Sequence, residues 1–255
     1  MVISDKHRYV FIELPNTATV AIHNELCEHY DGVPILAPGV GRHIHYHQFL
    51  ATATPEQKGY FAFSCIRNPL DATVTNYFKH KTNSGGVFTD PSRWRRNGGW
   101  VTDRDLERFR FIRDTGADFA TYFRRFYRFP PYDNWSSLAH KKLDYVIRFE
   151  NLQDDFAHVL AMLGITPRRP LPMHNKTAER EEAFWSYYTP GIRRQAVRVF
   201  GPFMRAWGYS FPHHWDNTTV PWYDEVLFRA VGLLRRRLEW GAGWDARLFR
   251  RVLGL

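Results

Sequence analysis

Two segments within the first 81 residues share one pattern, a short apolar strand followed by a tight turn and an amphipathic helix. In the first, residues 8–14 (RYVFIEL) are rich in β-branched and aromatic side chains, and residues 18–30 carry apolar side chains at helical spacing. In the second, an apolar run after residue 59 leads into a turn at 67–69 and a helix that begins near Asp71. Successive units of this kind build a parallel sheet with its functional loops at the carboxyl ends of the strands. We therefore predict an α/β fold, with a central parallel sheet and helices on both faces.

The rest of the chain adds elements of the same kinds. A short strand, a helix, a strand followed by a helix, and one further helix are predicted within residues 31–47, 103–129, 141–165 and 189–212. After about Pro221 the composition shifts to Arg-rich amphipathic segments, which are broken at residues 241–243 (GAG). We predict one domain over residues 1–220 and a basic amphipathic appendage over residues 221–255.

Basic residues outnumber acidic ones, with 35 Lys and Arg against 26 Asp and Glu and a formal charge of +9. This excess favours an anionic partner such as a nucleotide, a sulfated or phosphorylated ligand, nucleic acid or an acidic membrane. The charge is not gathered into a recognisable nucleic-acid-reading motif, so we expect no nucleic-acid partner. Cys27 and Cys65 lack CxxC spacing, which argues against a disulfide framework or a zinc site built on them.

No apolar run near the N-terminus is long enough for the core of a signal peptide, and no later segment reaches the roughly 18 apolar residues of a membrane span. We therefore expect a cytoplasmic protein. The basic residues 222–255 are also compatible with peripheral contact to an anionic membrane. The alternative is a solvated helix face that covers the protein's own core.

The strongest sign of a ligand site is the spacing of eight between Arg67 and Thr75 in RNPLDATVT. It puts a guanidinium at the end of a strand and a hydroxyl two turns into the following helix, so that both can bind one phosphate. The alternative is an arginine paired with Asp71 and a threonine that packs locally. The strand-to-helix setting favours phosphate binding.

Here the sequence resembles the sulfotransferases that use 3′-phosphoadenosine 5′-phosphosulfate (PAPS). Their 3′-phosphate motif runs Arg-Asn-Pro, then Asp, then Ser, as in FAFSCIRNPLDATVTNYF with Thr75 in place of Ser. Residues 145–165 (YVIRFENLQDDFAHVLAMLGI) and 174–209, with Asn-Lys-Thr, Tyr-Tyr-Thr-Pro and a final Gly-Tyr, resemble later segments of the carbohydrate branch. The resemblance spans roughly residues 8–212. It implies a fold related to P-loop kinases and sulfuryl transfer from PAPS, without a metal, to a hydroxyl of a carbohydrate or glycan-like acceptor.

The turn in LPNTATVAI resembles the family's 5′-phosphosulfate loop, a Pro-Lys-Thr-Ala-Gly-Thr-Ser or Pro-Lys-Ser-Gly-Thr-Thr sequence at the start of the first helix. The residues that this chain keeps are Pro15, Thr17, Ala18 and Thr19. The resemblance implies that this turn, Asn16 included, holds the 5′ end of the donor through backbone amides at the helix start. The alternative is an ordinary connection with Thr17 as the helix N-cap.

Asn16 stands where the family has a lysine, and the turn lacks the family's glycine. The family's lysine stabilises the charge that builds on the bridging oxygen as the sulfuryl group leaves. Either Asn16 or a basic group from elsewhere, such as Arg42, must then do this work. If neither does, the chain is a catalytically impaired protein of the same fold that binds PAPS, its product adenosine 3′,5′-bisphosphate (PAP), or sulfated glycans.

A general base is expected in GRHIHYHQF, because related carbohydrate 2-O-sulfotransferases have a histidine in a similar stretch. The resemblance assigns this role to His43, with His45 as the second candidate. On a strand, His43, His45 and His47 would share one face and could suggest zinc, but no carboxylate or thiol lies close in sequence to complete the set.

Two further expectations rest on weaker signals. The resemblance implies that Lys176 approaches the 3′-phosphate; the alternative is a solvated loop lysine. Aromatic and arginine side chains within residues 82–129 are expected to line the acceptor cleft, because flat rings suit sugars and guanidinium groups suit acidic ones. Incomplete glycine motifs argue against dinucleotide-binding and NTPase functions.

Overall fold

A five-stranded mixed sheet with strand order β3-β1-β2-β4-β5 forms the base of the molecule. The computed structural model describes residues 1–37, 41–128, 131–133, 142–172 and 183–240. The strands are β1 (Val2–Ser4), β2 (Tyr9–Ile12), β3 (Val33–Pro34), β4 (Phe61–Ile66) and β5 (Tyr145–Arg148). Strands β2, β4 and β5 are parallel, as the strand–turn–helix units predict.

The expectation of a wholly parallel sheet is wrong at one edge. Strand β1 is antiparallel to both β2 and β3. Only four residues, 5–8, connect β1 to β2, and a connection this short permits a hairpin but no crossover.

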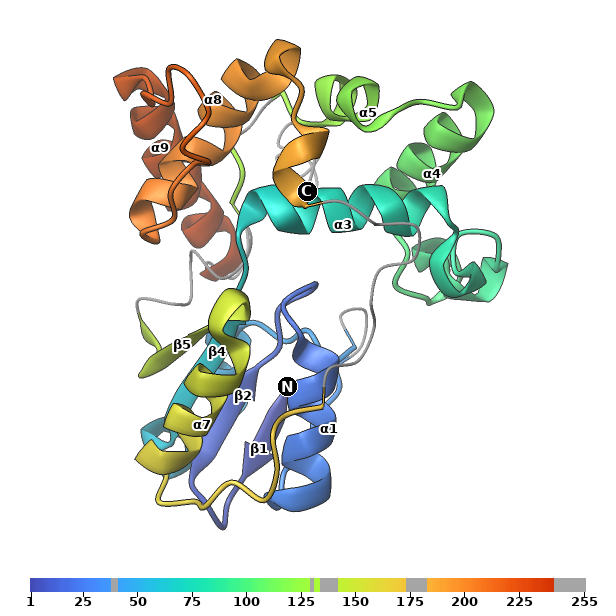
Figure 1. The fold of residues 1–255 in the computed structure, drawn as a ribbon. Coiled ribbons are helices and arrows are strands. Elements are labelled where there is room, and N and C mark those ends of the chain that lie inside the picture. Colours follow the sequence, from blue (N-terminus) through green and yellow to red (C-terminus); the bar gives the residue numbers. More distant parts are fainter. Residues whose placement is uncertain (38–40, 129–130, 134–141, 173–182, 241–255) are drawn as a thin grey trace.

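The register of the parallel strands brings their carboxyl ends to one edge of the sheet. Phe11 lies opposite Phe63, and Phe63 opposite Tyr145. The turns that follow β2, β4 and β5 therefore emerge side by side, below helix α3 (Pro69–Lys81) in Figure 1. This edge is where ligands bind in parallel α/β sheets.

Both faces of the sheet are covered. Helices α1 (Thr19–His29) and α7 (Leu152–Met162) pack on the face that carries Phe11, Phe63 and Ile147. The opposite face packs against Phe49 of the short helix α2 (Tyr46–Thr52) and its flanking segments. Two helices of 11 residues therefore cover one face, whereas the other face is covered by one helix of seven residues and by irregular segments.

A second, helical layer lies beyond the carboxyl edge of the sheet (Figure 1). Its members are α3, α4 (Asp103–Thr115), α5 (Phe119–Phe126), α8 (Pro190–Ala206) and α9 (Trp222–Trp240). Short 3₁₀ turns span Gln57–Gly59, Ser84–Gly86, Pro91–Arg93, Arg95–Asn97, Phe149–Asn151 and Phe184–Tyr187. An aromatic core that includes Phe123, Tyr188 and Phe200 joins α3, α5 and α8.

The single helix expected over residues 103–129 is wrong. Helix α4 ends where Gly116 adopts a left-handed conformation with φ of 63°. Asp118 then caps α5 by accepting a hydrogen bond from the Thr121 amide at 2.8 Å.

Helix α9 begins at Trp222 and packs against α8. Asp224 pairs with Arg198 at 3.0 Å, and Glu225 pairs with Arg205. The predicted helix break at 241–243 lies outside the described residues. Of the helices described, none combines the length and the apolar character needed to cross a lipid bilayer.

Candidate functional site

The turn between β2 and α1 contains left-handed backbone conformations that usually require glycine, although it has no glycine. Asn16 and Ala18 have positive φ angles of 66° and 60°, a conformation that costs a non-glycine residue about 1 kcal/mol. Ala18, not Thr17, is the N-cap residue of α1. The Thr17 hydroxyl instead donates to the Leu14 carbonyl at 2.9 Å, so the N-cap alternative is wrong. The amides of Thr19 and Val20 at the start of α1 have no preceding helix carbonyl to bind, and amides in this position attract anions.

Arg67 connects this turn to helix α3. Its Nη2 donates to the Thr75 hydroxyl at 3.0 Å and its Nη1 to the Asn16 carbonyl at 3.3 Å. Its Nε donates to the Asp71 carboxylate at 2.6 Å, and the guanidinium lies 4.0 Å from the centre of the Phe149 ring. The predicted approach of Arg67 to Thr75 and its pairing with Asp71 therefore occur together.

Helix α3 starts two residues earlier than expected. Asn68 caps it by accepting a hydrogen bond from the Leu70 amide at 3.0 Å, and Pro69 is its first residue. Asp71 thus lies within the first turn, where it orients the Arg67 side chain.

The sequence analysis missed Lys79, which lies on α3 and reaches the same turn. Its Nζ donates to Asn16 Oδ1 at 2.6 Å, while Asn16 Nδ2 donates to Asn76 Oδ1 at 2.9 Å. Burial lowers the pKa of Lys79, and the charge of Arg67 lowers it further. A signal was present, because Asp71, Thr75 and Lys79 follow one another at intervals of four and share one helix face.

Arg42, named above as one possible substitute for the missing lysine, pairs with Glu13. Its Nε lies 3.3 Å from Glu13 Oε2. The Glu13 carboxylate is fully buried and also lies 2.9 Å from His23 Nδ1.

His43 lies beside the end of β2. Its Nδ1 is 3.0 Å from the Glu13 carbonyl oxygen, and because a carbonyl only accepts, the proton is on Nδ1 and the lone pair of the neutral ring on Nε2. Burial lowers the pKa of His43, which favours this neutral form. A histidine in this state is suited to accept a proton.

His45 and His47 lie at the start of a helix, not on a strand. His45 is the N-cap residue of α2, with its amide 2.9 Å from Gln48 Oε1. Within the described part of the chain, no three His, Cys, Asp or Glu side chains gather into a metal-binding group. Lys176 lies outside the described residues, so its predicted contact with the 3′-phosphate stays a prediction.

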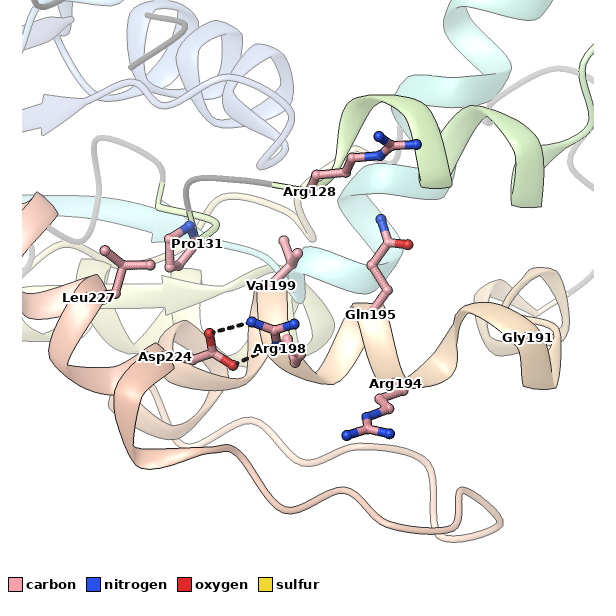
Figure 2. Close-up of a pocket in the computed structure, with 9 residues that line it drawn as sticks. All are labelled: Arg128, Pro131, Gly191, Arg194, Gln195, Arg198, Val199, Asp224 and Leu227. Atoms are coloured by element: carbon pink, nitrogen blue, oxygen red, sulfur yellow. Dashed lines mark hydrogen bonds and ion pairs between the residues drawn. The ribbon is translucent and has the colours of Figure 1, made fainter. Parts of the chain in front are cut away.

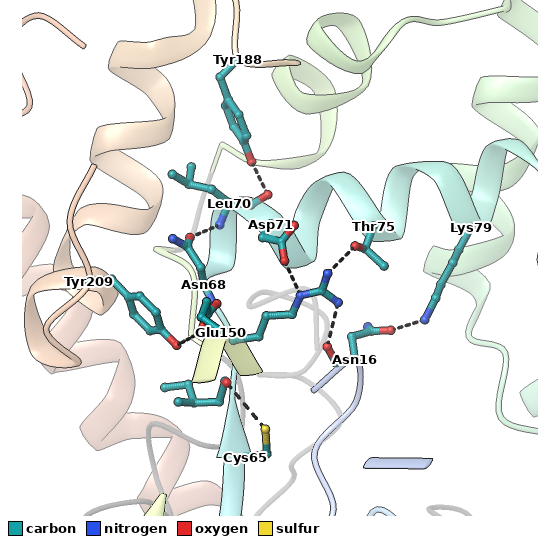
Figure 3. Close-up of polar contacts among 12 residues, drawn as sticks. Asn16, Cys65, Asn68, Leu70, Asp71, Thr75, Lys79, Glu150, Tyr188 and Tyr209 are labelled. Carbon is teal, nitrogen blue, oxygen red and sulfur yellow. Dashed lines mark hydrogen bonds and ion pairs between the residues drawn. The ribbon is translucent and has the colours of Figure 1, made fainter. Parts of the chain in front are cut away.

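The segment over residues 183–212 reaches the start of α3 at two points (Figure 3). The Tyr188 hydroxyl donates to the Leu70 carbonyl at 3.0 Å. The Tyr209 hydroxyl donates to Glu150, whose other carboxylate oxygen accepts from the Asn68 amide at 2.7 Å. The Tyr-Tyr-Thr-Pro and Gly-Tyr motifs thus support the turn that carries Arg67.

A separate groove of about 490 Å³ lies among α8, α9 and the segment after α5 (Figure 2). Its lining residues are Arg128, Pro131, Gly191, Arg194, Gln195, Arg198, Val199, Asp224 and Leu227. The lining includes three arginines and one carboxylate, and that carboxylate already pairs with Arg198. The groove is therefore cationic, and the sequence analysis did not identify it.

Comparison of the chain with known protein families, curated proteins and solved structures finds no match. The chemistry of the site therefore has to be inferred from its own residues. Two cationic side chains, Arg67 and Lys79, meet the positive end of α1 at one turn, and a neutral histidine lies beside the preceding strand end. This arrangement suits a ligand that carries more than one anionic group.

Proposed function

We propose that this protein binds PAPS and transfers its sulfuryl group to a hydroxyl of a carbohydrate or glycan-like acceptor. One observation carries the proposal: Arg67 contacts both Thr75 and the backbone of Asn16. The two sequence motifs that resemble phosphate-binding elements, far apart in the chain, therefore form a single cationic site.

In this proposal Arg67 and Thr75 hold the 3′-phosphate. Arg67 uses three of its five N–H groups in the contacts with Asp71, Thr75 and Asn16. One N–H on each terminal nitrogen is left for a phosphate, which suits two-point binding. Asp71 and the Phe149 ring keep the guanidinium plane fixed.

The 5′ end of PAPS would occupy the turn over residues 15–19. The left-handed conformations of Asn16 and Ala18 lead the chain into α1, whose first amides bind the phosphosulfate. Pro15 is exposed beside this turn, and Thr19 is the first residue of the helix.

His43 is the better candidate for the base. It would take the proton of the acceptor hydroxyl as that oxygen attacks sulfur, and PAP would leave with the bridging oxygen. The half-buried, neutral ring of His43 suits this role, whereas His45 caps α2.

Transfer of labelled sulfate from PAPS to a panel of desulfated glycosaminoglycans and smaller sugars tests the proposal. Wild type is expected to transfer sulfate, and His43→Ala to transfer it about 10²- to 10⁴-fold more slowly. A wild type that is inert while Asn16→Lys is active would favour a binding protein that has lost turnover. Inactivity of both the wild type and Asn16→Lys on every acceptor would contradict the enzyme proposal.

The second candidate, a protein that binds sulfated glycans without turnover, is favoured by the arginine groove of Figure 2. Arg128→Ala with Arg194→Ala should then weaken binding to heparin and reduce its salt dependence, since each arginine pairs with a sulfate. Equal heparin affinity of this double variant and wild type would remove the second candidate.

A further inference from the structure

Lys79 differs from the other cationic side chains around the turn in having no carboxylate partner. Arg67 pairs with Asp71 at 2.6 Å, and Arg42 lies 3.3 Å from Glu13. Among the described residues no carboxylate forms an ion pair with Lys79, and its Nζ instead donates to the Asn16 amide oxygen. A half-buried ammonium without a counter-charge is stabilised when an anion binds next to it.

The side chain of Asn16 positions the Lys79 ammonium. Its side-chain nitrogen donates to Asn76 Oδ1 at 2.9 Å, which fixes the amide so that its oxygen faces Lys79 at 2.6 Å. Lys79 is thereby held against the turn that leads into α1 (Figure 3). The ammonium of Lys79 therefore lies against the side chain at position 16, although the two residues are 63 positions apart.

We propose that Lys79 is a catalytic residue of the transfer reaction, and that Asn16 positions it. The proposal rests on the function proposed above. In the transfer step the acceptor oxygen forms a bond to sulfur, and the bond from sulfur to the bridging oxygen breaks. Its electron pair goes to that oxygen, the hydroxyl proton goes to His43, and PAP leaves. Lys79 stabilises the negative charge that develops on the bridging oxygen.

Burial and the nearby charge of Arg67 both lower the pKa of Lys79. Both effects disfavour the charged ammonium while the site is empty, and both are offset by the negative charge of a phosphosulfate. Asn16 is then a positioning residue: it neither donates a proton nor carries charge.

The experiment compares Lys79→Met, the double variant Asn16→Lys/Lys79→Met and the control Lys81→Met with wild type. Lys81 lies on the same helix and is exposed, with its Nζ 5.6 Å from the centre of the Phe78 ring. Two quantities are measured: PAP affinity by isothermal titration, and conversion of PAPS to PAP with the acceptor that gives the highest wild-type rate. PAP binding also reports that each variant is folded.

Lys79→Met is expected to convert PAPS about 10²- to 10³-fold more slowly, the loss typical of removing one transition-state donor, with PAP affinity changed less than about 10-fold. The double variant should regain at least about 10-fold of that rate, because it returns an ammonium to the same place. Lys81→Met should match wild type in both measurements.

Unchanged PAPS conversion by Lys79→Met would overturn the proposal, as would an equal loss of rate and PAP affinity, since Lys79 would then only anchor the nucleotide. A wild type that binds PAP but converts no PAPS would overturn the role of Lys79 and leave the nucleotide site standing. A wild type that binds no PAP would overturn the proposed function itself, and the role of Lys79 with it.

Discussion

Replacing Arg67 with alanine should abolish the stabilisation that PAP gives to the folded protein. Arg67 is buried and makes three hydrogen bonds, to Asp71, Thr75 and the backbone of Asn16. A ligand that binds only the folded state at about 100 times its Kd stabilises it by about 2.7 kcal/mol. For a protein of this size that corresponds to a rise in Tm of about 5–11 °C.

Loss of a buried cation that binds phosphate costs about 4 kcal/mol, or about 1000-fold in Kd. At the same PAP concentration, the Arg67→Ala variant would keep less than about 0.1 kcal/mol of stabilisation, a Tm shift below about 0.5 °C. Differential scanning calorimetry with and without PAP resolves this difference.

The Arg67→Ala variant also removes the arginine that pairs with the buried Asp71 carboxylate, which lowers the stability of the free protein by about 3–5 kcal/mol. The variant Arg67→Ala/Asp71→Ala removes both charges and keeps the comparison interpretable if the single variant unfolds. Adenosine 5′-monophosphate, which lacks the 3′-phosphate, should shift the Tm of wild type and variant alike. A folded variant that PAP stabilises as much as wild type would refute the assignment of Arg67.

Three further predictions test neighbouring features. Burial lowers the pKa of His43, so its neutral form persists to a pH below the ordinary histidine value of 6.5. The rate of PAPS conversion should therefore fall only below pH 6.5. A fall centred above this pH would contradict the assignment of His43 as the base. Ala18→Gly should raise the free energy of unfolding in urea by about 1 kcal/mol, since Ala18 has φ of 60°, and no gain would argue against strain in the turn. A Cβ on Gly201 would lie 2.3 Å from Val220 Cγ2, so Gly201→Ala should lower the Tm and Val220→Ala should restore it in part. An unchanged Tm would mean that the segment just before α9 is not held closely to α8.

The parallel part of the sheet could be predicted from the sequence because each strand–turn–helix unit is local. Strands β2, β4 and β5 each carry an apolar run followed by a helical pattern within about 25 residues. The antiparallel edge of the sheet could not be predicted from the sequence, since β1 has only three residues and its hairpin to β2 contains no glycine. Arg8 adopts the positive φ of 54° in that hairpin, which hides the usual turn signal.

In the candidate site, too, the local contacts could be predicted from the sequence and the long-range contacts could not. The contact between Arg67 and Thr75 follows from a spacing of eight residues across one strand end and one helix, so it could be predicted from the sequence. The contact between Lys79 and Asn16 depends on how α3 lies over the turn, which only the tertiary structure defines. Arg42, one possible substitute for the missing lysine, pairs with the fully buried Glu13 carboxylate, and this contact too depends on the tertiary structure.

A crystal structure with PAP bound tests the central claim most directly. The account predicts the 3′-phosphate within hydrogen-bond distance of Arg67 and Thr75, and the 5′-phosphate at the first amides of α1 with the Lys79 ammonium beside it. PAP bound elsewhere, for instance in the arginine groove, or a crystal soaked at saturating PAP that shows this turn without nucleotide, would contradict it.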